Sequence, residues 1–204
     1  MTGKGIVKFG QDARLVLASG NVGKHREFAD LFAPLGIELV PQGTLGVQEA
    51  PEPHCTFIEN ALAKARHAAD ATGLPALADD SGICVNALGG APGVLSARYA
   101  GEPKSDARNN GKLLDALAPH VDKSAYYYCV LVLLRSAHDP QPVIAEGIWH
   151  GEVVALPRGT GGFGYDPHFW LPAHRQTAAE MLPERKNRFS HRALALQSLL
   201  QALA

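Results

Sequence analysis

The chain of 204 residues is 46% hydrophobic, and its formal net charge at pH 7 is −1. This length and apolar content are enough for one sizeable hydrophobic core. A near-neutral chain has no global field that attracts nucleic acid polymers or anionic membrane surfaces, so we expect neither as a partner. Since no apolar run is long enough to span a bilayer, the sequence also argues against a membrane protein.

The placement of cysteine and histidine argues against a disulfide framework and against a zinc site. Cys55, Cys84 and Cys129 are widely spaced, which is typical of a reducing compartment. The nine histidines form no His-Glu-x-x-His arrangement. Residues 1–14 are polar and lack the apolar region of a secretory signal. We therefore expect a cytoplasmic protein. Residues 1–13 are expected to form a loose arm and residues 14–204 a single domain, in which a division into two lobes is possible at this length.

The first predicted elements are a short buried strand at Leu15–Ala18, a glycine-containing loop at Ser19–Lys24 and an amphipathic helix that ends near Gly36. A loop of this kind holds phosphate well, because its backbone N–H groups and the positive helix end face the anion and Lys24 adds a full charge. The alternative is an ordinary tight turn with a solvated lysine. The residues leave these two interpretations about even.

A second strand is predicted at Ile37–Val40, followed by a long polar connection that contains Glu49 and Glu52. Long loops inside compact domains often serve a site, although most acidic loop residues are merely solvated.

The next helix begins with a capping box, Thr56 to Glu59, and ends at Gly73. Asn60, Lys64 and His67 share one stripe of this helix. On spacing, a solvent-facing Lys64 is the more common case.

A buried strand is then predicted at residues 75–80, ending in Asp79 and Asp80 ahead of Gly82. Neighbouring strand residues point to opposite faces, so the two aspartates are expected to do different work. Carboxylates at the carboxyl end of a strand suggest a hard divalent cation. The alternative is a common Asp-Asp-Ser-Gly turn, after which Ile83–Val85 returns as a hairpin strand.

The middle of the chain predicts a surface helix at 106–117, capped by Ser105, and a central strand at Tyr126–Leu134 that is buried on both faces. Two shorter strands are predicted at Val143–Ile148 and Glu152–Leu156, with bends at the intervening glycines.

A loop at residues 158–167 combines four glycines with Phe163, Tyr165 and Asp166. The glycines leave backbone N–H groups accessible, and the two aromatic rings suit stacking on a base. Exposed aromatics are unusual in a plain flexible loop, so we favour a binding role.

Near the C-terminus, Ser190 is placed to cap a last leucine-rich helix. His191 and Arg192 would then lie at the positive helix end, where carbonyl or phosphate oxygens are bound. The alternative is that they are ordinary polar residues of a first turn.

Taken together, these stretches resemble the inosine triphosphate pyrophosphatase family, from about Leu15 to Leu203. Any one of them is a weak signal, but six in order at compatible spacing are specific. The stretches that carry the resemblance are Ser19–Lys24, Thr56–Ala61, Ala78–Gly82, Leu88–Gly93, Gly159–Pro167 and Ser190–Arg192.

The resemblance implies an α/β fold with a long, twisted, mixed β-sheet flanked by helices, two lobes and a central nucleotide cleft. It also implies a homodimer that hydrolyses ITP, dITP or XTP to the monophosphate and pyrophosphate with Mg²⁺. Such an enzyme would cleanse the nucleotide pool.

The resemblance further implies residue roles. Asp80 is expected to act as general base and metal-linked carboxylate, Asp79 to support it and Lys64 to reach the phosphates. Glu52 is expected near the metal. The residues expected to bind substrate are Ser19, Gly20, Asn21, Val22, Gly23, Lys24, Ser81, Phe163, Gly164, Tyr165, Asp166, Lys186, His191 and Arg192.

Two features depart from the family pattern. A Glu-Thr-Gly segment often precedes the capped helix, whereas this chain has Glu52-Pro53-His54, so Glu49 stays an alternative metal ligand. The arm before Leu15 is also longer than usual. Two other functions stay open: a phosphatase with an aspartyl nucleophile, which no Asp-x-Asp spacing supports, and a non-catalytic nucleotide-binding module, which leaves the carboxylate pair unexplained.

Overall fold

A computed structural model of the chain describes residues 14–33 and 36–203. The arm expected at residues 1–13 lies outside the described residues. The chain divides into two compact units. Unit 1 comprises the described residues of Met1–Asp80, Cys129–Gly147 and Arg192–Ala204, and unit 2 comprises Ser81–Tyr128 and Ile148–His191.

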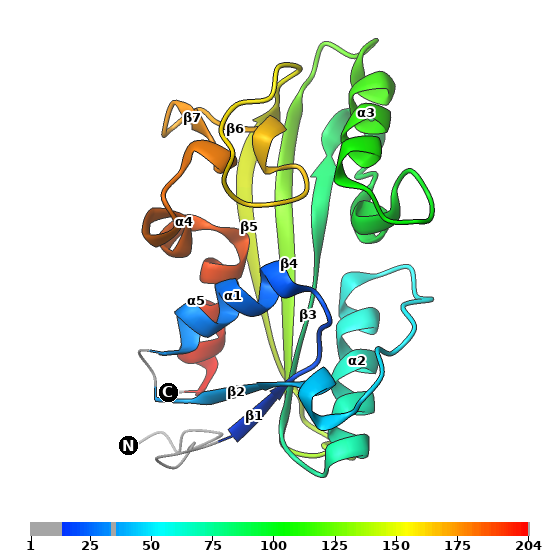
Figure 1. Cartoon of the computed structure of the whole chain (residues 1–204), viewed down its shortest axis with the longest axis vertical. Helices are drawn as coiled ribbons and strands as arrows, with labels where there is room; N and C mark the ends of the chain where they lie inside the picture. The colour runs from blue at the N-terminus through cyan, green and yellow to red at the C-terminus, as the bar shows by residue number, and fades with distance from the viewer. Residues whose placement is uncertain (1–13, 34–35, 204) are drawn as a thin grey trace. The chain divides into compact units, whose positions relative to one another are not determined.

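The described strands form one seven-stranded mixed sheet in the order β2-β1-β3-β4-β5-β6-β7 (Figure 1). β1 pairs in parallel with β2 and with β3, whereas β6 pairs antiparallel with β5 and with β7. The strands are β1 (Arg14–Leu17), β2 (Glu38–Pro41), β3 (Ala76–Val85), β4 (Ser124–Leu134), β5 (Val143–Val153), β6 (Phe169–Leu171) and β7 (Gln176–Thr177).

Helices flank these strands, which confirms the predicted α/β class. The α-helices are α1 (Val22–Phe32), α2 (Phe57–Thr72), α3 (Asp106–Leu117), α4 (Pro183–Phe189) and α5 (His191–Leu203). The 3₁₀ helices are η2 (Gln42–Leu45), η3 (Asn86–Leu88), η4 (Gly93–Arg98), η5 (Asp166–His168) and η6 (Ala178–Glu180).

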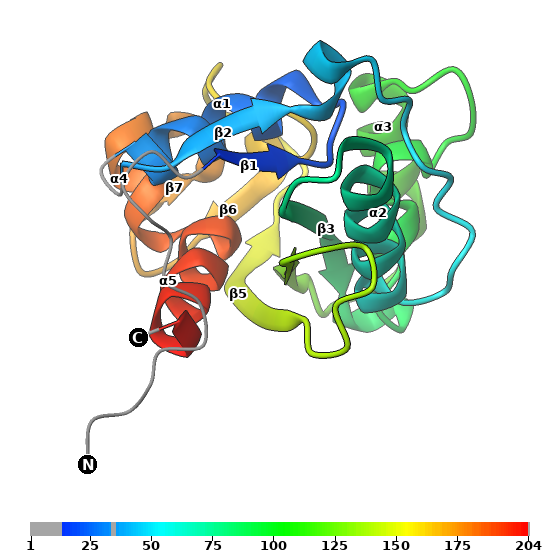
Figure 2. The same ribbon diagram turned by 90° about the horizontal axis from the view of Figure 1, so that it is seen from below.

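Unit 1 has its own hydrophobic core, built where α1 and α5 pack against the strands. Phe28 and Phe32 of α1 meet edge to face, with ring centroids 6.4 Å apart, because the aromatic pair prefers that geometry. The alanine-rich face of α2 is buried separately. Figures 1 and 2 show α1 and α5 on one side of β3 and α2 on the other.

Unit 2 has a second core that is rich in aromatic rings. Tyr127, Trp149 and Phe169 pack together, with centroid separations of 4.6 Å between Tyr127 and Phe169 and 5.4 Å between Trp149 and Phe169. Leu113 and Leu117 bring the inner face of α3 into the same cluster. This core supports the loop at residues 158–167, because Tyr165 belongs to it.

The capping signals predict two helices accurately. Thr56 accepts a hydrogen bond from the N–H of Glu59 at the start of α2, and Gly73 ends the helix with a φ of 68°. Ser105 accepts a hydrogen bond from the N–H of Arg108 at the start of α3. Each cap satisfies a backbone group that the helix itself leaves unpaired, so helix ends are legible in sequence.

The hairpin predicted around Gly82 is wrong. β3 runs without interruption from Ala76 to Val85, so Asp79 and Asp80 lie in mid-strand. The glycine serves close packing: a Cβ at Gly82 would lie 2.4 Å from the carbonyl oxygen of Gly93 and 2.4 Å from the hydroxyl of Ser96. The strand that ends near the aspartates is β1. It pairs with Ala76 and Leu77 of β3 and ends before it reaches the level of Asp79.

The two strands predicted at 143–148 and 152–156 are one strand, β5. Its residues alternate between buried and exposed from Val143 onward, which is the period of a strand with one covered face. Gly151 does not break it, since the glycine packs its backbone against Phe169 and Trp170 of the neighbouring β6. Neither β6, β7 nor α4 is predicted by the sequence patterns.

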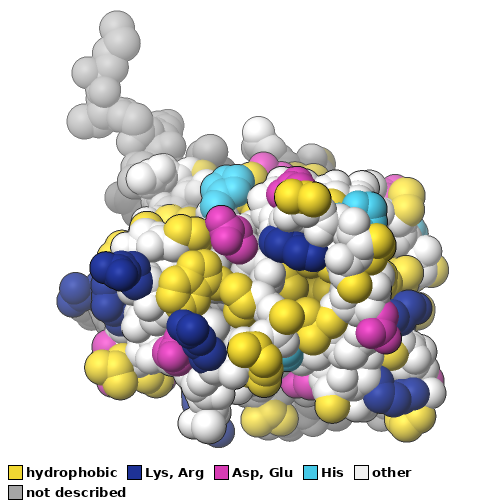
Figure 3. Space-filling view, turned by 90° about the horizontal axis from the view of Figure 1, so that it is seen from above, with side chains coloured by type: hydrophobic (Ala, Val, Ile, Leu, Met, Phe, Trp, Pro, Cys, Tyr) yellow, Lys and Arg dark blue, Asp and Glu magenta, His cyan; other side chains and the backbone are white. Residues whose placement is uncertain are grey.

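Within the described part of the chain, no helix is long and apolar enough to cross a bilayer. Figure 3 shows one face of the molecule, on which both Lys or Arg and Asp or Glu side chains occur. This face therefore carries no field of a single sign, in agreement with the net charge of −1.

Candidate active site

The loop between β1 and α1 has the geometry of an anion-binding turn. Asn21 caps α1 by accepting a hydrogen bond from the N–H of Lys24 (3.1 Å), and the hydroxyl of Ser19 accepts one from the N–H of Asn21 (3.3 Å). The predicted loop is shorter in the structure, because α1 already begins at Val22. Residues 19–23 are half-buried or exposed, so the turn and the first residues of α1 are open to a ligand. The positive end of α1 and Lys24 thus meet at one place in unit 1.

Asp79 binds the lysine of this loop from the middle of β3. Its Oδ2 lies 2.8 Å from Nζ of Lys24 and 3.9 Å from Nε of Arg192. Burial of the whole carboxyl would raise its pKa, but the charges of Lys24, Arg192 and Lys64 outweigh that cost and lower the pKa to about 2. Asp79 is therefore ionised and fixed at neutral pH.

Arg192, at the start of α5, lies near both Asp79 and a further carboxylate on α1. Its Nη1 lies 2.6 Å from Oε2 of Glu27, which stands three residues after Lys24 on α1. The guanidinium is buried, and that burial works against its charge, but Glu27 and Asp79 raise its pKa further above its ordinary value. The sequence patterns do not single out Glu27 as a site residue. Its position one helical turn after Lys24 is the signal that places it on the same face of α1.

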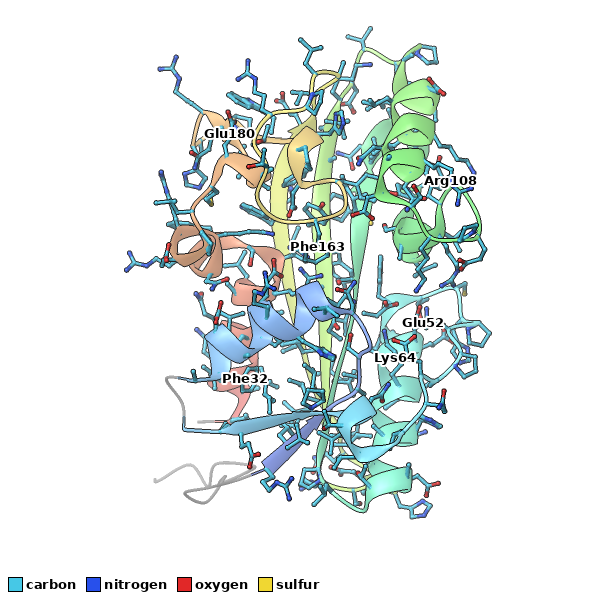
Figure 4. All side chains as sticks on the ribbon, viewed as in Figure 1. Phe32, Glu52, Lys64, Arg108, Phe163 and Glu180 are labelled. Carbon is cyan, nitrogen blue, oxygen red and sulfur yellow. The ribbon has the colours of Figure 1, made fainter. Side chains whose placement is uncertain are left out.

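Asp80 faces a different set of partners, as strand alternation predicts. Its Oδ1 lies 3.3 Å from Nζ of Lys64, and the same ammonium lies 2.6 Å from Oε1 of Glu52. Figure 4 shows the labelled side chains of Glu52 and Lys64 beside each other, one from the loop before α2 and one from α2 itself. Lys64 is therefore a buried member of the cluster rather than a solvent-facing lysine.

Asp80 and Lys64 both have pKa values above their ordinary values. Burial raises the pKa of Asp80 and is only partly countered by Lys64 and Lys24, while Glu52 and Asp79 raise it further. Burial lowers the pKa of Lys64, but the surrounding carboxylates of Asp79, Asp80 and Glu52 outweigh it, so that pKa is raised. A carboxyl with a raised pKa beside a charged lysine is a common signature of proton-transfer sites.

Asn60 connects this cluster to the loop before α2. Its Nδ2 donates to Oδ2 of Asp80 (3.2 Å) and to the carbonyl of His54 (3.3 Å), and its Oδ1 accepts from the N–H of His54 (3.1 Å). The sequence stripe of Asn60, Lys64 and His67 pointed to this face, but Asn60 was not assigned a role. It holds Asp80 and the loop that carries Glu52 in one arrangement.

The carboxylates of Asp80 and Glu52 suit a divalent cation whose other ligands are substrate oxygens and water. Asp80 and Glu52 supply two carboxylates, and no group of three or more His, Cys, Asp or Glu side chains with metal-site geometry occurs among residues 14–33 and 36–203. Mg²⁺ is commonly bound through one or two carboxylates together with phosphates. Glu49, the alternative ligand, has its carboxylate against the backbone of Gly20, in the turn that precedes α1.

In unit 2, the glycine-aromatic loop is fastened around Asp166. Oδ2 of Asp166 accepts a hydrogen bond from the N–H of Phe163 (3.0 Å) and from Nζ of Lys186 (2.8 Å). The same ammonium lies 5.5 Å from the centroid of the half-buried Phe163 ring. Tyr165 is buried and donates its hydroxyl to the carbonyl of Ser96 (2.8 Å). Phe163, Asp166 and Lys186 thus form one arrangement.

The imidazole of His191 lies flat against the aromatic core of unit 2. Its ring centroid is 4.6 Å from that of Tyr127, with an interplanar angle of 10°, and 6.4 Å from that of Trp149. Ser190 has an extended backbone directly before α5, as an N-cap residue does. Ser81 is half-buried on β3 at the first position of unit 2.

The site residues therefore fall into two groups. In unit 1 the glycine loop, Asp79, Asp80, Lys64 and Glu52 are held by charged and polar contacts, and in unit 2 Phe163, Asp166 and Lys186 are held together. A glycine loop after the first strand, a buried aspartate pair and lysines on mixed-sheet α/β architecture define a class of protein that handles phosphorylated ligands.

The chain belongs to the Ham1 family, whose sequence model matches residues 15–202. It is 65% identical over 191 residues to a protein of Nitrosomonas europaea named dITP/XTP pyrophosphatase, with 94% of each chain covered. It is 64% identical to a protein of the same name from Ralstonia nicotianae, over 93% of this chain and 96% of that one.

Solved structures agree with this membership. A HAM1 protein from Coxiella burnetii superposes with a TM-score of 0.87 at 48% identity, over 94% of this chain and 98% of the other. A structure from Mycobacterium abscessus, described as a nucleoside-triphosphatase and dITP/XTP pyrophosphatase, has a TM-score of 0.73 at 39% identity, over 92% and 98% of the two chains. The fold is that of the Ham1 proteins.

Proposed function

We propose that this protein hydrolyses non-standard purine nucleoside triphosphates, namely ITP, dITP and XTP, to the monophosphate and pyrophosphate. The observation that carries the proposal is the cluster of buried Asp80 and Lys64 with half-buried Glu52, which joins a proton acceptor to a cation and a second carboxylate. The high identity to relatives named dITP/XTP pyrophosphatase supports the choice of substrate.

The triphosphate is assigned to the loop from Ser19 to Lys24. Its N–H groups at the positive end of α1 suit phosphate oxygens, and Lys24, already turned inward by Asp79, adds a positive charge. This provides a local basic site in a protein whose net charge is near zero.

Asp80 is assigned the role of general base. A water attacks the α-phosphorus, its proton passes to the Asp80 carboxylate, and the bond from the α-phosphorus to the bridging oxygen breaks so that pyrophosphate departs with the bond electrons. Lys64 stabilises the negative charge on the phosphate oxygens. Asp79 does not exchange a proton at neutral pH, since its pKa is about 2, and it supports the step by fixing Lys24.

Mg²⁺ is the proposed cofactor, with Asp80 and Glu52 as its protein ligands. When bound, the cation supplies charge neutralisation on phosphate oxygens. The support for this proposal is the oxygen-only donor pair described above, held in place by Asn60 and Lys64.

Binding of the purine base of the substrate is assigned to two segments. These are the glycine-aromatic loop with Lys186, and the start of α5. The residues are Phe163, Gly164, Tyr165, Asp166, Lys186, His191 and Arg192. A donor placed for the 6-oxo group of inosine or xanthosine is left unpaired by the 6-amino group of adenosine. One buried unpaired polar group costs about 1–3 kcal/mol, which is roughly a 5- to 150-fold preference.

We further propose a cytoplasmic homodimer. The three cysteines are free thiols, which suits a reducing compartment. Exposed Ile144 and Ile148 on the outer face of β5 are apolar surface of the kind that subunit contacts cover. Sedimentation equilibrium tests the dimer: twice the chain mass of 21.7 kDa is expected, and a monomer at all concentrations contradicts it.

The experiment that tests the reaction is a product assay with Mg²⁺ and each of ITP, dITP, XTP, ATP and GTP. Pyrophosphate is expected as the first phosphorus product from the first three, with slow turnover of ATP. GTP also carries a 6-oxo group, so its turnover measures whether a further penalty acts at the 2-amino group. Orthophosphate as the first product would instead indicate a phosphatase with an aspartyl nucleophile, and binding without turnover would indicate a non-catalytic module.

A further inference from the structure

Helix α3 holds the glycine-aromatic loop by one residue. The N–H of Gly164 donates to Oδ2 of Asp106 (2.7 Å), and the carbonyl oxygen of Gly164 accepts from Nδ2 of Asn110 (2.9 Å). Asp106 and Asn110 stand four positions apart, so they lie on the same face of α3. Together they bind both backbone groups of one loop residue, and we call this pair the Gly164 clamp.

The clamped residue directly follows the ring assigned to the base. Gly164 has a φ of +64°, a left-handed conformation that side-chain-bearing residues rarely adopt. Phe163, on its N-terminal side, is held through its own N–H by Asp166. The backbone at Phe163 and Gly164 is therefore held by one anchor within the loop and by one anchor on α3. Figure 4 shows the ribbon around the labelled Phe163.

Asn110 lowers the stability of the fold when its contact with the loop is left aside. Its Oδ1 is buried and has no hydrogen-bond partner among residues 14–33 and 36–203, although its Nδ2 is bound to Gly164. A buried amide oxygen without a partner disfavours folding, and alanine is the better helix former at an interior helical position. The amide at this position thus serves the loop more than it serves the stability of α3.

We propose that Asp106 and Asn110 are positioning residues that fix Phe163 for stacking on the purine base. This proposal rests on the base-binding role given to the loop under the proposed function. A loop that is already ordered pays less conformational entropy when the base binds, so the clamp increases affinity for the base. It acts through Gly164 and leaves the contacts of Lys24, Asp80 and Lys64 in unit 1 unaltered.

The test compares the two products as ligands. Binding of inosine monophosphate and of pyrophosphate, each with Mg²⁺, is measured by calorimetry for the wild type, Asn110→Ala, Asp106→Ala and Asp106→Asn. We expect the dissociation constant of the monophosphate to rise about 5- to 10-fold in the two alanine variants, the value of one lost hydrogen bond, with pyrophosphate binding unchanged. Asp106→Asn keeps an acceptor and should be intermediate.

Steady-state kinetics with ITP gives a second readout. KM should rise by the same factor while kcat stays within about twofold, because the clamp does not touch the reacting atoms. Asp115→Ala is the matched control, since it removes the same charge from an exposed position of α3 and should behave as wild type. Thermal unfolding should show Asn110→Ala at least as stable as the wild type.

Each other result has a distinct meaning. Weakening of pyrophosphate binding by the same factor, a fall in kcat at constant KM, or unchanged monophosphate binding would overturn the clamp. If an alanine variant of Asp106 does not fold, Asp106→Asn and Asn110→Ala decide. A wild type that releases no pyrophosphate from ITP would overturn the proposed function instead, while the calorimetry would still show whether the clamp supports binding of the base.

Discussion

Asp79 and Asp80 are neighbours in sequence, yet their surroundings shift their pKa values in opposite directions. Both lose water on burial, which raises the pKa of a carboxyl. Asp79 receives Lys24 and Arg192, and its pKa falls to about 2, whereas the partners of Asp80 include Glu52, and its pKa is raised. Strand alternation makes this possible by sending the two side chains to opposite faces of β3.

The lowered pKa of Asp79 predicts a stability that depends on acidity. The unfolded carboxyl titrates near 3.8 and the folded one near 2, so ionised Asp79 stabilises the fold by about 2 kcal/mol above pH 4, and this stabilisation falls as pH drops through 2. The advantage of the wild type over Asp79→Asn in urea unfolding should therefore shrink by about 1 kcal/mol between pH 6 and pH 3. A difference that is constant with pH would contradict this; Asp115→Asn, an exposed control, should follow the wild type.

Asp80 carries the opposite expectation. Because its folded pKa lies above the unfolded value, the ionised carboxylate costs stability at neutral pH. Asp80→Asn should lose less stability than Asp79→Asn, measured with a chelator present. The same variant should lower kcat by about 10²- to 10⁴-fold, the range for removal of a general base. Near-normal turnover would remove Asp80 from the base role.

For single residues, the sequence predicts which charged side chains belong to the site better than it predicts the residues that contact them. The separation of roles between Asp79 and Asp80 follows from the period of a strand. Glu27, Asn60, Asp106 and Asn110 could not be assigned, because each works through a contact with a segment distant in sequence, as Asn60 does with Asp80 twenty positions away.

At the scale of elements, helix ends are predicted well and strand continuity poorly. Caps such as Thr56 and Gly73 are local signals, satisfied within one turn. Gly82 and Gly151 read as breaks because a glycine commonly marks a turn, whereas here each lets another backbone approach a continuing strand. Only the tertiary neighbour distinguishes these two uses of glycine.

This account of Gly82 is testable by substitution. A Cβ at Gly82 would collide with the backbone oxygen of Gly93, which cannot swing away as a side chain does, so Gly82→Ala should destabilise unit 2 by about 1–3 kcal/mol.

Gly111→Ala is the matched control on α3. Nothing lies within 4 Å of a Cβ there, and removing a helical glycine should stabilise the protein by about 0.5–1 kcal/mol. Urea unfolding measures both variants, and equal effects at the two glycines would show that backbone entropy, not close packing, governs Gly82.

At the scale of the whole molecule, two hydrophobic cores are linked by continuous strands. The chain passes from one unit to the other within β3 at Asp80, within β4 at Tyr128 and within β5 at Gly147. A strand that loses its ladder on one side of such a point loses cooperative support on the other. We therefore expect the protein to unfold in one transition although it has two cores.

The positions of tryptophan make this expectation measurable. Trp149 and Trp170 both belong to unit 2, so their fluorescence reports on that unit directly. Leu131 lies on β4 in the core of unit 1 and is fully buried, so Leu131→Ala should cost about 2–5 kcal/mol through lost contacts and a cavity. If unfolding is a single transition, this change in unit 1 lowers the urea midpoint seen by tryptophan fluorescence as much as that seen by far-ultraviolet circular dichroism. Leu113→Ala, in the core of unit 2, is the control that must move both signals. A fluorescence midpoint unmoved by Leu131→Ala would mean that the units unfold independently, each stabilised by its own core.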